Sequence, residues 1–118
     1  MVASSKVYVP DRGDVVWVDF DPQTGREQAG RRPALVISPV SYNRASGLAV
    51  MCPITNRIKG YPFEVPLPAG LSVTGVVLSD QLKSQDWRTR KVEFICQLAP
   101  ESLAGVLHRI NSLLGPLK

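Results

Sequence analysis

The sequence predicts a mainly β fold, a small SH3-like barrel of curled antiparallel strands with one C-terminal α-helix. Three observations lead to this prediction. Short apolar runs are separated by ten prolines and nine glycines, which is typical of strands joined by tight turns. Helical apolar spacing is convincing only near the C-terminus. The 118 residues have the length of a single domain, 1–118, whereas a β-sandwich usually needs more residues.

Six strands are expected. The first, Val15–Phe20, follows a turn at residues 11–14, and the second, Ala34–Ser38, is apolar on both faces. Pro53 lies in the third expected strand, Leu48–Ile54, and indicates a bulge or a sheet edge there, because proline has no backbone N–H to donate to a neighbouring strand. The remaining four strands are expected at Leu48–Ile54, Phe63–Leu67, Val76–Ser79 and Lys91–Leu98.

The expected helix begins at Pro100 and Glu101, which suit a first turn, and ends at Gly115 and Pro116. Its large aliphatic residues recur at helical spacing and form a face that is normally core, part of which could serve a partner chain. His108 lies off this face, so we expect it to be a solvated helix residue rather than a catalyst. The aliphatic residues are Leu103, Val106, Leu107, Ile110, Leu113 and Leu114.

The composition is ordinary for a soluble globular protein, and we expect the protein to be cytoplasmic. Apolar residues make up 44% and charged residues 20% of the chain. No apolar run approaches the roughly 20 residues of a membrane span, and the N-terminus does not resemble a secretory signal. Cys52 and Cys96 lie in apolar surroundings without neighbouring ligands, so we expect reduced, buried thiols rather than a disulfide or a metal site.

The charge pattern favours an anionic partner. The net charge is +4, and residues 31–60 contain five basic and no acidic residues. Nucleic acid is the leading candidate for this partner, and a solvated basic face is the alternative.

Familiar catalytic signatures, such as a nucleophile elbow, a P-loop or zinc-ligand spacing, are absent from the sequence. Asp14, Asp19 and Asp21 are better explained as turn and strand-end acids than as magnesium ligands. We therefore expect neither a metal ion nor a cofactor.

Three polar segments could carry chemistry. In the first, Pro33 restricts Arg32 to extended geometry, so its guanidinium projects from a rigid strand start and could clamp a phosphate. A loop bearing Arg26, Glu27 and Gln28 precedes it. In the second segment, Thr55 and Asn56 end an apolar strand and are followed by two basic residues. Ordinary turn chemistry is the alternative explanation for that segment.

The third polar segment, residues 78–94, contains Asp80, Gln81 and Lys83, followed by Trp87 among basic residues that include Arg90. An aromatic ring among cations suits single-stranded nucleic acid, through stacking and charge. A half-buried core tryptophan is nearly as common.

These segments, taken in order, resemble the MazF/PemK/Kid family of toxin endoribonucleases, and the MazF branch most closely. The resemblance rests on VVWVDFDP, GREQAGRRPALVISP, CPITN, KGYPFEV, LSDQLKS and WRTR and extends from about Tyr8 to Gly115. It implies an SH3-like barrel, a homodimer and metal-independent cleavage of single-stranded RNA, mRNA included, at short sequences. The products would carry 2′,3′-cyclic phosphate and 5′-hydroxyl ends. Such a toxin inhibits translation and growth and is neutralised by an acidic, MazE-like antitoxin.

The resemblance also implies roles for individual residues. Arg32 and Thr55 match the catalytic arginine and threonine, and Glu27 lies in the loop that closes over RNA. Glu27 is a candidate general base, with Asp80 as an alternative. Asn56, Arg26 and Arg31 depart from the residues common in the family, which bears on the target sequence. The expected RNA contacts are Gln28, Arg31, Asn56, Lys59, Asp80, Gln81, Lys83 and Arg90.

Two other functions remain open at this point. A CcdB-like toxin of the same fold poisons gyrase by binding alone and relies on a tryptophan near its C-terminus, which the closing residues LGPLK lack. A non-cleaving RNA-binding module is the second alternative.

Overall fold

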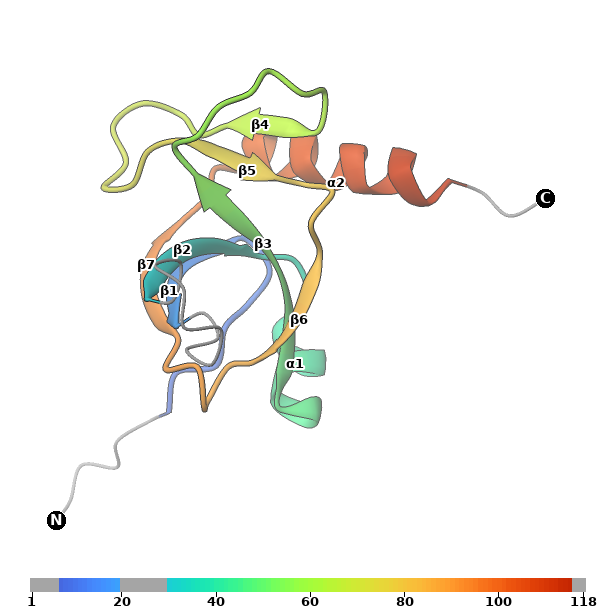
Figure 1. The fold of residues 1–118 in the computed structure, drawn as a ribbon. Helices are drawn as coiled ribbons and strands as arrows, with labels where there is room; N and C mark the ends of the chain where they lie inside the picture. The colour runs from blue at the N-terminus through green and yellow to red at the C-terminus, as the bar shows by residue number, and fades with distance from the viewer. Residues whose placement is uncertain (1–6, 20–29, 116–118) are drawn as a thin grey trace, which may run out of the picture.

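A strongly curled antiparallel sheet forms the body of the computed structural model, which describes residues 7–19 and 30–115 (Figure 1). A short helix follows the second strand and a long helix ends the described chain. The predicted mainly β fold with a C-terminal helix is therefore confirmed. The elements are β1 (Asp14–Asp19), β2 (Arg31–Val36), α1 (Val40–Ser46), β3 (Leu48–Thr55), β4 (Glu64–Pro66), β5 (Val76–Leu78), β6 (Lys83–Asp86), β7 (Glu93–Gln97) and α2 (Pro100–Leu114).

The strand order is β4-β5-β3-β2-β1-β7, and β6 also pairs with β3. Strand β3 is thus shared: residues 48–51 pair with β6, and residues 54–55 pair with β5. Pro53 lies where β3 changes partner, and neither β6 nor β5 pairs with it. A proline is tolerated in this central strand because its missing N–H interrupts neither ladder.

Both faces of β1, β2 and β3 are buried, which explains the continuous apolar run at residues 34–37. One face packs beneath α2, whose Val106 and Ile110 are buried. The other face packs around Trp87. The first cluster includes Val15, Leu35, Cys52 and Ile54, and the second includes Val16, Val18, Ala34, Val36, Ala49 and Met51.

Two elements were not expected from the sequence. Helix α1 has seven residues and no side-chain cap, so its pattern is too short to identify. Strand β6 reads Lys-Ser-Gln-Asp and is largely exposed, so no apolar alternation marks it. The phenylalanine that we expected to end the first strand, and the loop residues Glu27 and Gln28, lie outside the described residues.

Helix α2 has the predicted start and its predicted end at Gly115. His108 is exposed, as predicted. Leu113 and Leu114 at the end of the aliphatic face are also exposed, to 44% and 67%, so this part of the face lies outside the core. Both cysteines are free thiols. None of the described helices is long and apolar enough to cross a membrane.

Candidate functional site

The register between β2 and β3 brings Arg32 and Thr55 to the same end of the sheet. Ala34 lies opposite Pro53 in this antiparallel pair, and continuing the register by two residues on each strand sets Arg32 opposite Thr55. Alternate residues of a strand share a face. Arg32 and Thr55 therefore share the face of Ala34 at this end of the two strands.

Thr55 is held from two directions. Its backbone pairs with Val76 at the start of β5, and its Oγ1 accepts a hydrogen bond from the backbone N–H of Arg57 at 3.1 Å. The hydroxyl group therefore has a fixed rotamer, and its proton can be donated to a ligand. The neighbouring Asn56 accepts a hydrogen bond through Oδ1 from Thr74 Oγ1 at 3.0 Å.

A pocket of about 210 Å³ opens beside Thr55. Its lining brings together four of the predicted site residues, Thr55, Lys59, Asp80 and Gln81. The other lining residues are Arg57, Tyr61, Phe63, Glu64 and Leu78.

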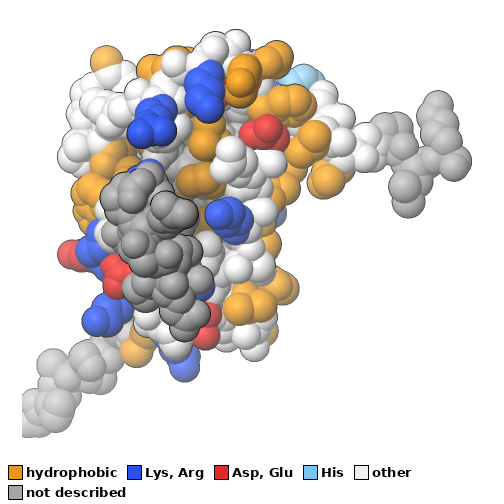
Figure 2. All heavy atoms as spheres, in the orientation of Figure 1, with side chains coloured by type: hydrophobic (Ala, Val, Ile, Leu, Met, Phe, Trp, Pro, Cys, Tyr) orange, Lys and Arg blue, Asp and Glu red, His pale blue; other side chains and the backbone are white. Residues whose placement is uncertain are grey.

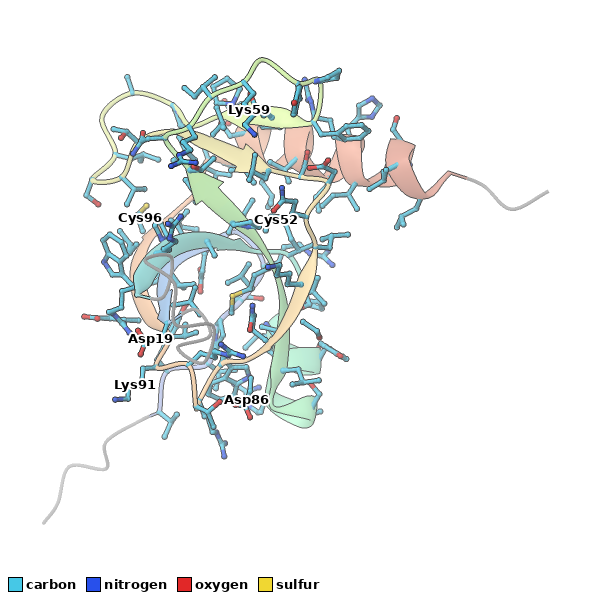
Figure 3. The ribbon with its side chains drawn as sticks, viewed as in Figure 1. Asp19, Cys52, Lys59, Asp86, Lys91 and Cys96 are labelled. Carbon is cyan, nitrogen blue, oxygen red and sulfur yellow. The ribbon has the colours of Figure 1, made fainter. Side chains whose placement is uncertain are left out.

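The aromatic wall of this pocket was not among the predicted site residues. Tyr61 is 60% exposed, and Lys59 Nζ lies 6.0 Å from the centroid of its ring. Figure 3 shows Lys59 at the β4 end of the molecule. Tyr61 and Phe63 both belong to the KGYPFEV motif on which part of the resemblance rests. The motif could therefore have indicated these two site residues.

Glu64 fastens the segment that forms the pocket rim. Its carboxylate accepts the backbone N–H of Lys59 at 3.0 Å and of Gly60 at 2.8 Å. From helix α2, Arg109 donates through Nε to the carbonyl of Pro62 at 2.9 Å. Neither contact was predicted from the sequence, because each joins a side chain to a backbone group that reaches it only after folding.

Arg31 and Arg90 lie outside the pocket. Arg31 Nη1 forms an ion pair with Asp19 at 2.7 Å, and its Nη2 reaches Glu93 at 3.1 Å and the carbonyl of Lys91 at 2.7 Å. Arg90 Nη1 donates to the carbonyl of Asp19 at 3.5 Å. Figure 3 shows Asp19 and Lys91 close together at the opposite end of the barrel from Lys59. That these two arginines contact RNA stays a prediction.

Lys83 lies on the same side of the sheet as Arg32. It pairs with Met51 and lines a shallow cleft whose floor is formed by Val18, Ala34 and Pro53. In Figure 2, Lys and Arg side chains occupy the β4–β5 end and the neighbourhood of β6, with apolar side chains between them. This mixture of positive charge and apolar surface suits a flexible anionic polymer with flat, apolar groups.

Asp14 and Asp19, two of the three aspartates considered as magnesium ligands, have structural partners, and Asp21 lies outside the described residues. Asp14 is buried and accepts hydrogen bonds from the Tyr8 hydroxyl at 2.5 Å, the Asp11 N–H at 3.0 Å and Gln97 Nε2 at 3.3 Å. Asp19 is paired with Arg31. Within residues 7–19 and 30–115, no group of three or more His, Cys, Asp or Glu side chains could hold a metal ion.

The thiols are poorly suited to nucleophilic chemistry. Burial, with a smaller contribution from the charge of Asp80, raises the pKa of Cys52 to about 12. Burial also raises the pKa of Cys96. Because the thiolate is the reactive form, neither cysteine is a candidate nucleophile near neutral pH.

Comparison with known proteins identifies the class to which this fold and site belong. Residues 11–114 match the family described as PemK-like, MazF-like toxin of type II toxin-antitoxin system. The chain is 51% identical over 108 residues to the endoribonuclease toxin MazF of Escherichia coli (strain K12), covering 92% of this chain and 96% of the relative. It is 33% identical over 108 residues to endoribonuclease PemK of Escherichia coli, covering 88% and 81%.

Solved structures agree with these matches. The crystal structure of MazF from Deinococcus radiodurans superposes with a TM-score of 0.84 at 55% identity, covering 93% of this chain and 100% of that one. A MazE–MazF crystal structure from the same organism gives a TM-score of 0.83 at 51% identity, with 94% and 100% covered. The chain belongs to the PemK-like, MazF-like family of type II toxins. Within that family it falls in the MazF branch.

Proposed function

We propose that the protein is the toxin of a type II toxin–antitoxin system and acts as a sequence-specific endoribonuclease on single-stranded RNA, including mRNA. Cleavage of mRNA would inhibit translation and growth. The observation that carries the proposal is the β2–β3 register, which, continued past Ala34 and Pro53, brings Arg32 to the strand end that carries Thr55 and its pocket with Asp80 and Gln81. Membership of the MazF branch supports the same activity.

The reaction that these residues support is in-line attack of a ribose 2′-hydroxyl on the adjacent phosphate. The 2′-oxygen loses its proton and bonds to phosphorus, the bond from phosphorus to the 5′-oxygen breaks, and the 5′-oxygen takes a proton from solvent. The products carry a 2′,3′-cyclic phosphate and a 5′-hydroxyl. The nucleophile is internal, so the step requires charge stabilisation and proton transfer rather than a metal ion. Arg32 stabilises the phosphorane through two hydrogen bonds, and Thr55 donates its hydroxyl proton to a nonbridging oxygen. Glu27 accepts the 2′-hydroxyl proton, with Asp80 as the alternative base.

The pocket beside Thr55 fits a nucleobase better than a phosphate. Arg57 and Lys59 are balanced by Glu64 and Asp80, so the formal charge of the lining is zero. Tyr61 offers a stacking surface, and Asp80 and Gln81 offer hydrogen-bonding groups for a base edge. The phosphates would follow the cations outside it. The full proposed set of contacts is Gln28, Arg31, Asn56, Lys59, Asp80, Gln81, Lys83 and Arg90.

We further propose that the toxin works in the cytoplasm as a homodimer and is neutralised by an acidic, MazE-like antitoxin. The MazE–MazF crystal structures from Deinococcus radiodurans support this partner. A negatively charged antitoxin tail would lie along the surface that binds RNA and pair with Arg31, Arg32 and Lys59, and its binding would then exclude RNA.

The test is incubation of the purified protein with a long RNA in excess EDTA, followed by primer-extension mapping of the cuts. We expect full activity with the chelator, cuts at one short sequence, and resistance of a substrate whose ribose at the cut is 2′-deoxy. Cleavage of that deoxy substrate would show that water, not the ribose, is the attacking group. RNA binding without cleavage would instead indicate a binding module, and inhibition of gyrase without RNA binding would indicate a CcdB-like poison.

A further inference from the structure

The backbone just before β5 presses against the end of β3. Gly75 has φ +117°, and a Cβ placed on it would lie 2.3 Å from the carbonyl oxygen of Thr55 and 2.8 Å from its carbonyl carbon. Real Cβ atoms essentially never come within 3.0 Å of another heavy atom, so a side chain at this position requires a movement of at least about 0.7 Å. Glycine is therefore needed for close approach as well as for its backbone angle.

Neither side of this contact is free to retreat. The carbonyl of Gly75 accepts the N–H of Leu67 at 3.0 Å, which ties the residue to the segment after β4. Thr55 is tied to β5 through its pairing with Val76. Thr74 Oγ1 also donates to Asn56 Oδ1 at 3.0 Å, so the residues before β5 hold both residues at the β3 end. In Figure 1 the tip of β3 meets the beginning of β5.

We infer that Gly75 is a positioning residue for RNA cleavage, and that Thr74 assists it by holding Asn56. The inference rests on the proposed function, in which the Thr55 hydroxyl reaches a nonbridging phosphate oxygen. That hydroxyl is carried by the backbone that Gly75 touches, so a shift of the carbonyl moves the donor. Catalytic groups tolerate little displacement, and an error of about 1 Å can cost about 100-fold in rate.

A purely conformational role is the competing explanation for this glycine, and the chain contains a matched control. Gly70 lies in the same connection between β4 and β5, has φ +93°, and has no atom within 4 Å of the position that a Cβ would take. Gly70→Ala therefore introduces left-handed backbone strain in the same connection without a contact to Thr55. Any effect specific to Gly75→Ala reports the close approach.

The experiment compares Gly75→Ala, Gly70→Ala and the wild-type protein. Urea unfolding gives the folded fraction, fluorescence anisotropy gives the Kd for a 2′-O-methyl RNA of the mapped cut sequence, and single-site cleavage gives kcat and KM. We expect kcat per folded molecule to fall about 10- to 100-fold in Gly75→Ala, with Kd within about threefold of wild type. Gly70→Ala should keep its kcat. Equal kcat values in the two variants would overturn the inference.

A second pair of variants decides the matter if Gly75→Ala does not fold. Thr74→Val removes the hydroxyl that binds Asn56 and keeps the side-chain shape, whereas Thr74→Ser keeps the hydroxyl. We expect kcat to fall about three- to tenfold in Thr74→Val and to stay normal in Thr74→Ser. Normal turnover in Thr74→Val would refute the assisting role and, without a folded Gly75→Ala, the inference itself. A wild-type protein that cleaves no RNA would reject the proposed function before any variant is compared.

Discussion

Replacing Asn43 with alanine is expected to lower the free energy of unfolding by about 3–5 kcal/mol. Asn43 lies in α1 and is 0% exposed. Its Nδ2 donates to the carbonyl of Pro10 at 2.7 Å and to the carbonyl of Ser38 at 3.0 Å. Its Oδ1 accepts the hydroxyl proton of Ser38 at 2.5 Å. One side chain therefore satisfies three polar groups in the interior.

The magnitude follows from what the alanine leaves behind. Each buried polar group that loses its partner costs about 1–3 kcal/mol, and Asn43 leaves three of them. Ser38 Oγ keeps the N–H of Val50 as a donor at 2.8 Å, so only its own proton loses an acceptor. A water molecule entering the vacated space would recover part of the loss, which places the sum below the upper limit.

Urea unfolding followed by tryptophan fluorescence measures this loss. The indole Nε1 of Trp87 donates to the backbone carbonyl of Asn43 at 2.9 Å, so the probe lies beside the substituted residue. We expect an unchanged m-value and a lower midpoint, together with a fall in Tm of about 10–20 °C. Ser41→Ala, at an exposed position of the same helix, is the control. A loss below about 1 kcal/mol, or one equal to the control, would refute the count of buried hydrogen bonds.

Four further outcomes are expected. Arg32→Ala should lower kcat about 10²–10³-fold with a modest loss of RNA affinity. Arg32→Lys should also lose activity, because the point charge of an ammonium group cannot replace the two hydrogen bonds of a planar guanidinium. Near-normal turnover of the lysine variant would contradict the two-bond clamp. Thr55→Ala should impair cleavage more than Asn56→Ala, measured as kcat on one oligonucleotide. With a pKa of about 12, Cys52 should alkylate with iodoacetamide more slowly than Cys96 at pH 8, and both rates should rise with pH, as followed by mass spectrometry. Antitoxin binding should compete with a non-cleavable RNA and weaken with salt, and a stable ternary complex would rule out a shared groove.

The sequence predicted the strands that are buried on both faces and the helix whose apolar stripe is buried. Residues 34–37 are apolar because both sides of β2 face core clusters, and α2 shows helical spacing because Val106 and Ile110 pack on the sheet. Strand β6 is held through its backbone pairing with β3 and leaves its side chains exposed. Backbone pairing of a polar edge leaves no trace in the residue pattern, so this strand could not be predicted.

Some residues of the candidate site could likewise be predicted from the sequence, and others could not. Thr55, Lys59, Asp80 and Gln81 were predicted because they belong to short motifs, and the structure brings them together in one pocket. Gly75 was missed, because nothing in its sequence context distinguishes a glycine needed for close approach from one needed for a turn. Glu64 was missed in the same way, since its role is to accept N–H groups from the neighbouring rim segment.

The buried core around α1 also bears on the geometry of the proposed catalytic pair, Arg32 and Thr55. The N–H of Ile37 donates to the carbonyl of Val50 at 2.8 Å, in the same register that, continued past Ala34 and Pro53, sets Arg32 opposite Thr55. Ser38 Oγ accepts the N–H of Val50 and donates to Asn43, so the α1 connection pins this register. A slip of one residue would turn Arg32 to the opposite face of the sheet. The buried amide of Asn43 thus contributes to the geometry of a site that it does not touch, because it secures the alignment of the strands that carry it.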